Sequence, residues 1–179
     1  MRYTITDLLA YGFVGFISFP TWSKADVVAP GQPDVEGVYA VLREDVAVPE
    51  FVDDTRPVPH RRARTAAEAA DRWVTGVGVL YFGMAPLRRT SKHGTRSGLA
   101  QRIYEYQRHG LNGGSNHHGG KLIWQTSEPS TLFIAWKSLP EGESRGVESG
   151  LIAGFQQRMG KPPFANTGAP KKGVAPIFL

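Results

Sequence analysis

Two short apolar runs, Gly37-Val-Tyr-Ala-Val-Leu42 and Val77-Gly-Val-Leu-Tyr-Phe82, decide the fold of this chain. The first follows a Pro- and Gly-rich approach at 30–33, and a short apolar run bounded in this way is typical of a buried strand. A third run, Thr131-Leu-Phe-Ile-Ala-Trp136, has the same character. The three runs together predict the core strands of a small sheet.

Helical patterns separate and follow these strands. Thr65-Ala-Ala-Glu68 has the spacing of a capping box, which predicts a helix that runs through Trp73 and stops at Gly76. A second helix is expected over 99–109, and a third over the segment that ends at Gly160. Their apolar stripes and ends are set by Leu99, Ile103, Tyr106 and Gly110 in the second helix and by Val147, Leu151 and Phe155 in the third, with Ser144 as the expected cap.

The order of strand, inserted helix, strand, helix, strand and helix predicts an α+β fold, with a small, mainly antiparallel sheet of about three core strands flanked by helices. A chain of 179 residues without a linker is expected to form a single domain. Around the core we expect an N-terminal extension over 1–36, an insertion over 43–76 and a C-terminal tail over 167–179. The extension should hold a helix near Asp7–Tyr11 and then an extended segment packed on the core.

The charge balance, the absence of Cys and the short apolar runs limit the functions that this chain can have. The chain has 21 Lys and Arg against 16 Asp and Glu, a net charge of +5, which favours a polyanionic partner. It has no Cys, which excludes a disulfide framework, a thiolate nucleophile and Cys-ligated zinc and fits a reducing cytoplasm. The apolar run Phe13–Phe19 is far shorter than the roughly 20 residues of a spanning helix. We therefore expect a cytoplasmic protein with no membrane partner.

Two motif matches are set aside because their context is wrong. Gly142-Glu-Ser-Arg-Gly146 has the letters of a nucleophile elbow, but a polar loop with Pro140 precedes it, where a hydrolase needs a buried strand. Gly119-Gly-Lys121 has the end of a phosphate-binding loop, but Leu122 stands where a hydroxyl would hold magnesium.

Two charged residues lie where helices face the core. Arg102 shares a helix face with Leu99 and Tyr106, and Glu148 lies beside Leu151 by the same spacing of three and four residues. Arg and Glu are almost never fully buried without a partner. Either an Arg102–Glu148 ion pair joins the two helices, or both side chains reach solvent from the rim, or they belong to a functional site.

Five segments follow one another along the chain: Gly37-Val-Tyr39, Leu80-Tyr-Phe-Gly83, Leu99-x-x-Arg102-Ile-x-x-Tyr106, Glu148 with Leu151-Ile152, and Pro162-Pro-Phe-Ala-Asn166. Taken in this order, they resemble the motifs of the GIY-YIG nuclease family. The resemblance spans 37–166, nearly the whole chain. The loop at 112–124 and the N-terminal approach to Tyr39 also look like those of stand-alone bacterial members of about this size.

The chain departs from the family pattern in three places. Tyr39 and Tyr81 are 42 positions apart, whereas compact members keep the two tripeptides on a tight hairpin. Met84 stands where many members place a lysine, so that Arg88, Arg89 or Lys92 would have to supply the positive charge. The interval between Glu148 and Asn166 is also longer than in compact members.

The resemblance implies a metal-dependent DNA endonuclease that hydrolyses phosphodiester bonds. A single Mg²⁺ or Mn²⁺ would be held by Glu148 and water, and Arg102 would contact the scissile phosphate. Tyr39 and Tyr81 would orient the attacking water or take its proton, which requires a pKa well below the usual value of about 10. Tyr106 would bind the phosphate or hold Arg102, and Asn166 would close the site.

The expected partner is double-stranded DNA, bound through its backbone by basic residues. The residues in question are Arg61, Arg62, Arg64, Arg88, Arg89, Lys92, Arg96, His117, His118 and Lys121. Cutting both strands requires a homodimer or successive nicks. A restriction enzyme, a structure-selective repair or recombination nuclease, a module that binds nucleic acid without cleaving it, and an unrelated α+β enzyme remain open at this point.

Overall fold

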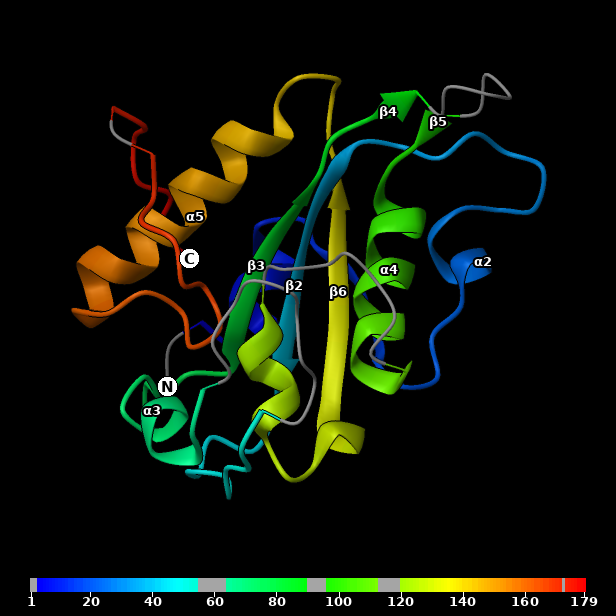
Figure 1. Ribbon diagram of the computed structural model, residues 1–179. Coiled ribbons are helices and arrows are strands. Elements are labelled where there is room, and N and C mark those ends of the chain that lie inside the picture. The colour runs from blue at the N-terminus through cyan, green and yellow to red at the C-terminus, as the bar shows by residue number, and fades with distance from the viewer. Residues whose placement is uncertain (1–2, 55–63, 90–95, 113–119, 172) are drawn as a thin grey trace.

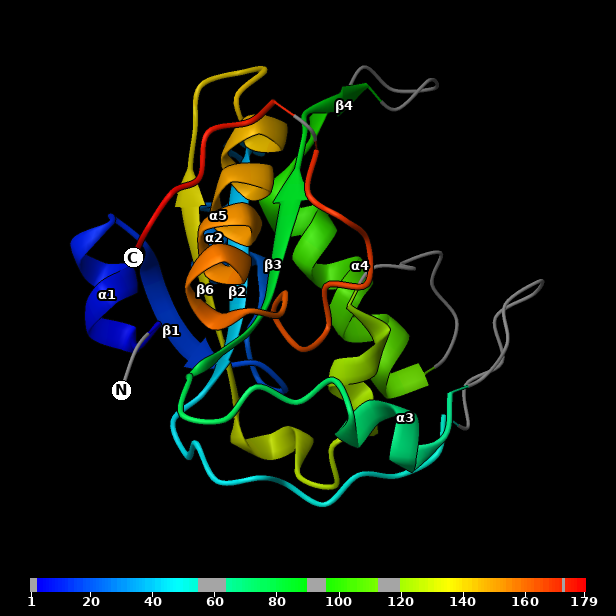
Figure 2. The same ribbon diagram turned by 90° about the vertical axis from the view of Figure 1, so that its left-hand side faces the viewer.

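The computed structural model describes residues 3–54, 64–89, 96–112, 120–171 and 173–179, without the side chains of 89, 96, 111 and 112. It has the expected α+β architecture, with helices on both faces of an antiparallel sheet (Figures 1 and 2). The sheet strands are β1 (Val14–Ser18), β2 (Gly37–Arg43), β3 (Val79–Ala85) and β6 (Leu132–Ser138). The other elements are α1 (Ile5–Ala10), α2 (Lys24–Val27), α3 (Ala66–Ala70), β4 (Arg88–Arg89), β5 (Arg96–Ser97), α4 (Leu99–Asn112), the 3₁₀ helices η1 (Lys121–Gln125) and η2 (Pro129–Thr131), and α5 (Ser144–Met159).

The sheet has four strands in the order β1-β6-β2-β3, all antiparallel to their neighbours. The expectation of about three core strands was too low, because the extended segment of the N-terminal extension pairs with β6 as the edge strand β1. Gly15 makes this pairing possible, since a side chain there would collide with the ring of Trp136. β3 forms the opposite edge of the sheet.

The two faces of the sheet carry different helices, because successive strand residues point to opposite sides. Tyr39 and Val41 of β2 pack in one apolar cluster with α4, whereas Val38, Ala40 and Leu42 pack in a second cluster with α5. Figure 2 shows α4 and α5 separated by the sheet. Residues from the two helices can therefore meet only around an edge or an end of the sheet.

Several element ends differ from the sequence-based expectation. α4 continues past Gly110 to Asn112, and Gly110 is needed for packing, because a Cβ there would collide with the ring of Trp124. Ser144 is the first residue of α5 and not its cap, since the cap position is Glu143. The capping box of Thr65 and Glu68 is present, but α3 ends at Ala70. α5 ends at Met159 and is capped, as expected, by Gly160, whose φ of 76° favours glycine.

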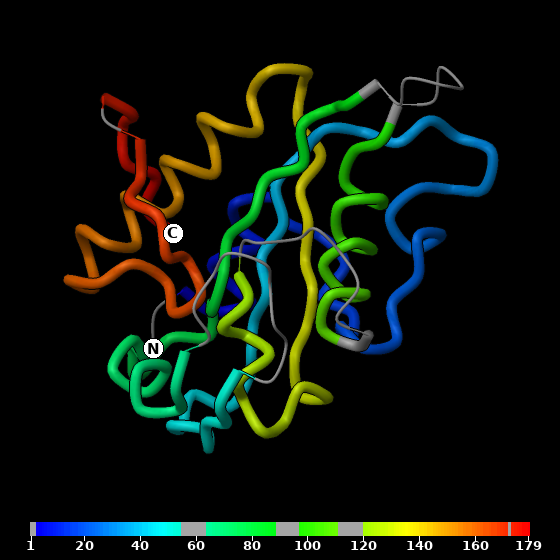
Figure 3. The backbone as a smooth tube through the Cα atoms, in the orientation of Figure 1, coloured from blue at the N-terminus to red at the C-terminus, as the bar shows by residue number. Residues whose placement is uncertain are grey.

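The described parts of the insertion between β2 and β3, residues 44–54 and 64–78, lie at one end of the sheet, where α3 contacts η1 (Figure 3). The Val52 amide donates to the Gln125 carbonyl at 2.8 Å, and the Gln125 side-chain amide donates to the carbonyls of Val52 and Arg64 at 3.0 and 3.1 Å. The insertion is thus hydrogen-bonded to the segment that precedes β6. Within the described ranges, no helix is long and apolar enough to cross a membrane.

Candidate active site

Three tyrosines form a buried ring cluster on the α4 face of the sheet. In the β2–β3 ladder Tyr39 lies opposite Gly83 and Val41 lies opposite Tyr81, so both tyrosines point to the same face as diagonal neighbours. Their ring centroids are 5.9 Å apart. Tyr106 of α4 completes the cluster at 6.0 Å from Tyr39 and 5.3 Å from Tyr81.

Packing requires glycine at Gly37 and Gly83, which belong to the segments Gly37–Tyr39 and Leu80–Gly83. The Tyr39 ring covers Gly83, so a Cβ at Gly83 would collide with it. A Cβ at Gly37 would meet the Lys137 carbonyl and the side chain of Leu99, the first residue of α4. Glycine at these two positions therefore allows Tyr39 to lie flat across β3 and α4 to approach β2.

Burial keeps the three phenols neutral. It raises the pKa of Tyr39, Tyr81 and Tyr106 above the usual 10, and the charge of Glu148 raises that of Tyr81 and Tyr39 further. The positive charge of Arg102 lowers the pKa of Tyr39 and Tyr81, but burial outweighs it. The lowered pKa that a general-base tyrosine would require is not found.

Tyr106 has a defined hydrogen-bond partner. Its hydroxyl donates to the carbonyl of Gly120 at 2.5 Å, at the start of η1. Gly120 has a φ of 67°, and a side chain there would collide with the Tyr106 hydroxyl. Tyr106 thereby joins α4 to the start of η1.

Arg102 reaches the cluster from α4 with an exposed fraction of 23%. Its Nη1 pairs with Glu105 Oε2 at 3.3 Å, so its ion pair is made within its own helix and not with Glu148. Its buried Nε has no hydrogen-bond partner among the described residues. Arg88 lies nearby, since both arginines line a narrow cleft with Ala85 and Pro86.

Glu148 reaches the same region from the opposite face of the sheet. Burial raises the pKa of its carboxyl to about 7, against the lowering effects of Arg145, a hydrogen bond from the Met84 backbone, Arg102 and Lys171. Glu148 and Tyr81 line one cavity of about 250 Å³ at the β3 edge. The cavity is completed by Gly120, Arg145, Ser149, Ile152, Ala165, Asn166, Thr167, Gly168, Ala169, Pro170 and Lys171.

Asn166 lines this cavity but is held by the backbone of β3. Its Nδ2 donates to the Phe82 carbonyl at 2.8 Å, and its Oδ1 accepts from the Phe82 amide at 2.9 Å. These bonds pair the outer edge of β3, which no strand covers in the described part of the fold. The amide that we expected in a catalytic role is thus bonded on both sides to the β3 backbone.

The expected DNA-binding residues are placed only in part. Arg61, Arg62, Lys92, His117 and His118, together with the side chains of Arg89 and Arg96, lie outside the described residues. Arg88 is exposed and Arg64 is half-buried. Lys121 forms an ion pair of 3.2 Å with Asp54 of the insertion, which neutralises its charge locally.

The donor set of the cavity fits a single divalent cation bound with substrate. Glu148 is the one acidic side chain that lines the cavity among the described residues, and no group of three His, Asp or Glu side chains is found in those ranges. Magnesium keeps most of its waters and needs only one or two carboxylates beside substrate phosphates. Glu148 can supply that one carboxylate.

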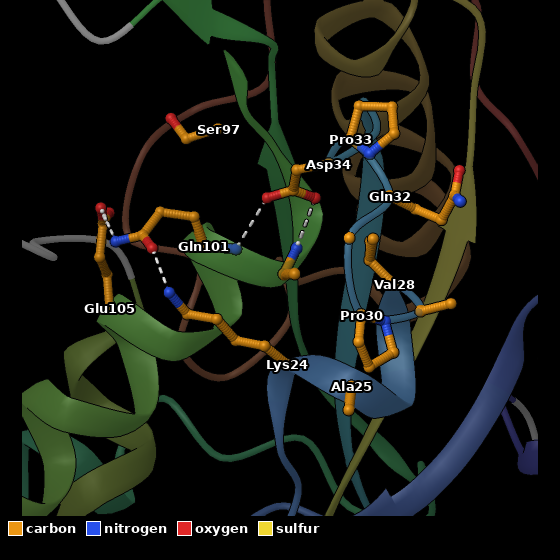
Figure 4. A pocket seen from close by; sticks show the side chains of 13 residues that line it. Lys24, Ala25, Val28, Pro30, Gln32, Pro33, Asp34, Ser97, Gln101 and Glu105 are labelled. Carbon is orange, nitrogen blue, oxygen red and sulfur yellow. Dashed lines mark hydrogen bonds between the residues drawn. The ribbon is translucent and has the colours of Figure 1, made fainter. Parts of the chain in front are cut away.

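A larger cavity lies elsewhere, between α2, the loop at 28–34 and α4, with a volume of about 950 Å³ (Figure 4). Its walls are mostly small apolar residues and prolines, and it contains none of the tyrosines or Glu148. Asp34 in its wall accepts hydrogen bonds from the backbone amides of Gly98, Ala100 and Gln101 at 2.7, 3.0 and 3.0 Å. Asp34 therefore caps α4, the helix that carries Arg102.

Compared with models of protein families, with curated proteins and with solved structures, the chain matches none.

Four residues with roles at the site were not predicted from the sequence. Arg145 is three positions before Glu148 on one helix, and this spacing was a usable signal. Lys171, Asp34 and Glu36 gave no signal, because each acts on a segment distant in sequence. Glu36 accepts a hydrogen bond of 2.9 Å from the amide of Ser144, the first residue of the helix that carries Glu148.

Proposed function

We propose that this protein is a divalent-metal-dependent phosphodiesterase that cleaves DNA. One observation carries the proposal: Tyr81 and Glu148, from opposite faces of the sheet, line the same cavity, and the charge of Arg102 acts on both. A fold that merely buried these side chains would not need a phenol and a carboxylate in the wall of one cavity, both within reach of the charge of a guanidinium.

Phosphodiester hydrolysis requires an attacking water, stabilisation of charge on the phosphoryl oxygens, and help for the leaving oxygen. Glu148 would hold Mg²⁺ or Mn²⁺, which when bound acidifies water and neutralises phosphate charge. Arg102 would donate to the phosphoryl oxygens, since its Nε has no partner in the described structure. Tyr81, as a neutral phenol, would orient the water by hydrogen bonding and would not take its proton.

A second candidate is a nucleic-acid-binding module that does not cleave. The observation in its favour is that Tyr39 and Tyr106 have no exposed surface and that Tyr106 already donates to Gly120. Access of substrate to these two phenols would require local movement, whereas Tyr81 retains 6% exposure at the cavity wall.

Cleavage of supercoiled plasmid DNA in Mg²⁺ or Mn²⁺, with and without chelator, tests the proposal. We expect nicked or linear product from the native protein and none from Glu148→Ala. Glu143→Ala, which removes an exposed carboxylate at the start of the same helix that makes no capping bond, should cleave normally. Circular dichroism and DNA binding of Glu148→Ala verify that it is folded.

The results of the cleavage assay distinguish the candidate functions. Metal-dependent cleavage that persists in Glu148→Ala removes Glu148 from the mechanism, and DNA binding without cleavage by the native protein identifies the binding module. Discrete fragments from linear duplexes indicate a restriction-like enzyme. Selective cutting of branched duplexes indicates a repair or recombination nuclease.

A further inference from the structure

The cavity beside Glu148 has two cationic side chains that the proposed chemistry does not use. Arg145 precedes Glu148 by three residues on α5, and Lys171 comes from the C-terminal segment. Both line the cavity, and both lower the pKa of the Glu148 carboxyl, so their charges act inside it. With one carboxylate against two cations, the cavity has a net positive charge.

These cations differ from the others in this part of the molecule. Arg145 and Lys171 form no ion pair or side-chain hydrogen bond with any residue that the structure describes. Other nearby cations are held by backbone carbonyls: Arg72 by Phe164 and Asn166, Lys161 by Asp71, and Arg158 by Leu179. Both side chains are exposed, so their hydrogen-bond donors face solvent at the mouth of the cavity, where a ligand can reach them.

The wall that carries Lys171 is anchored. Asn166 is fixed to Phe82 by its two side-chain bonds, and the Ala165 amide donates to the Leu80 carbonyl at 2.9 Å. Arg72 holds the carbonyls of Phe164 and Asn166 at 3.2 and 2.9 Å. The segment that carries Lys171 thus begins from a fixed position on the β3 edge, and residues 173–179 lie along α5, where the Ile177 amide donates to the Gly150 carbonyl at 2.8 Å (Figures 1 and 3).

We propose that Arg145 and Lys171 form a phosphate subsite that binds a backbone phosphate of the DNA next to the one that is cleaved. The subsite rests on the proposed function and names two further substrate-binding residues for it. The two cations share one cavity of about 250 Å³ with Glu148 and Tyr81, which is below the 300–1,000 Å³ typical of pockets for larger ligands. A phosphate held here lies beside Glu148 and Tyr81, which fixes the register of the strand at the reacting centre.

The test measures binding of a fluorescein-labelled 12-base-pair duplex without metal, as a function of salt concentration. Each phosphate contact to duplex DNA contributes about 0.9 to the slope of log K against log salt. We expect the slope of Arg145→Ala with Lys171→Ala to fall by about 1–2 and the affinity at low salt to fall about tenfold or more. The control pair Arg158→Ala with Lys161→Ala removes the same charge from neighbouring sites and should retain the native slope.

A second arm separates the sources of phosphate. Inorganic phosphate, titrated against the native protein, should compete with the duplex only in large excess. If it binds as tightly as the duplex, or if the Arg145 and Lys171 double variant keeps the native slope, the subsite for DNA is refuted. Because binding is measured without metal, the subsite and the nuclease activity are tested separately. If the double variant has a reduced slope but the native protein does not cleave DNA, the nuclease is refuted and the subsite is supported. If the native protein cleaves DNA but the double variant keeps the native slope, the subsite is refuted and the nuclease is supported.

Discussion

Asp34 and Glu36, two residues apart at the start of β2, each accept hydrogen bonds from the N-terminal end of a different helix, and the two helices lie on opposite faces of the sheet. Asp34 accepts from Gly98, Ala100 and Gln101 at α4. Glu36 accepts from the amide of Ser144, the first residue of α5, at 2.9 Å and from Leu87 at 3.3 Å. Because α4 carries Arg102 and α5 carries Glu148, one short segment fixes both helices relative to Tyr39.

Asp34→Ala should lower the free energy of unfolding. It leaves three amides at the start of α4 without their acceptor, and loss of a helix cap costs about 1–2 kcal/mol. Asp34→Asn keeps one neutral acceptor oxygen. Its free energy of unfolding in urea should therefore lie between those of Asp34→Ala and the native protein. Asp71→Ala, an exposed carboxylate in the described structure, serves as control, and equal stabilities of the Asp34 and Asp71 variants would refute the cap.

Glu36→Gln should make stability less dependent on pH in the acid range. Burial acts to raise the pKa of Glu36, but hydrogen bonds from Ser144, Gly142 and Leu87 outweigh it and hold the pKa below its usual 4.5. A lowered carboxyl pKa adds stability that is complete above pH 4.5 and is lost as the pH falls through the folded-state pKa. Urea unfolding from pH 3 to pH 7 should therefore show a native advantage that shrinks toward acid. A constant difference would contradict this.

Glu148→Gln should stabilise the metal-free protein while it abolishes cleavage. The Glu148 pKa is raised from 4.5 to about 7, so the folded state disfavours the ionised form and stability falls as the pH rises through that range. The variant should gain about 1–3 kcal/mol at pH 8 and almost nothing near pH 4. Thermal unfolding in chelator at both pH values measures the gain. A variant that is less stable than the native protein at pH 8 would show that burial does not disfavour the ionised Glu148 carboxylate.

Gly83→Ala should destabilise the protein by about 1–3 kcal/mol through overpacking. The added methyl group collides with the ring of Tyr39. With Tyr39→Ala also present, the collision is absent, so the double variant should be more stable than the sum of the single effects allows. A urea double-mutant cycle measures this coupling. Strict additivity would show that the Tyr39 ring does not lie over Gly83.

Asn166→Ala should affect stability more than chemistry. The substitution leaves the Phe82 amide and carbonyl at the β3 edge without partners, which costs about 1–3 kcal/mol if water cannot replace them. We expect lowered unfolding free energy, with the cleavage rate per folded molecule within a few-fold of native at a temperature where the variant is folded. A loss of cleavage as large as that of Glu148→Ala, at native stability, would restore a catalytic role.

The amino-acid sequence by itself determined the α+β class, the positions of β2, β3 and β6, and the apolar faces of α4 and α5. These features depend on alternation and helical periodicity over a few neighbouring residues, which the chain displays locally. The same locality explains why Thr65 and Glu68 were identified as a capping box.

Only the tertiary structure decided the contacts that complete the site. The bonds of Asp34 to Gln101, Asn166 to Phe82 and Glu36 to Ser144 join residues 67, 84 and 108 positions apart. The ionisation of the tyrosines and of Glu148 likewise depends on burial and on charges brought from other elements. Local sequence pattern contains neither the register of the strands nor the approach of a distant segment, because both are set by packing of the whole chain.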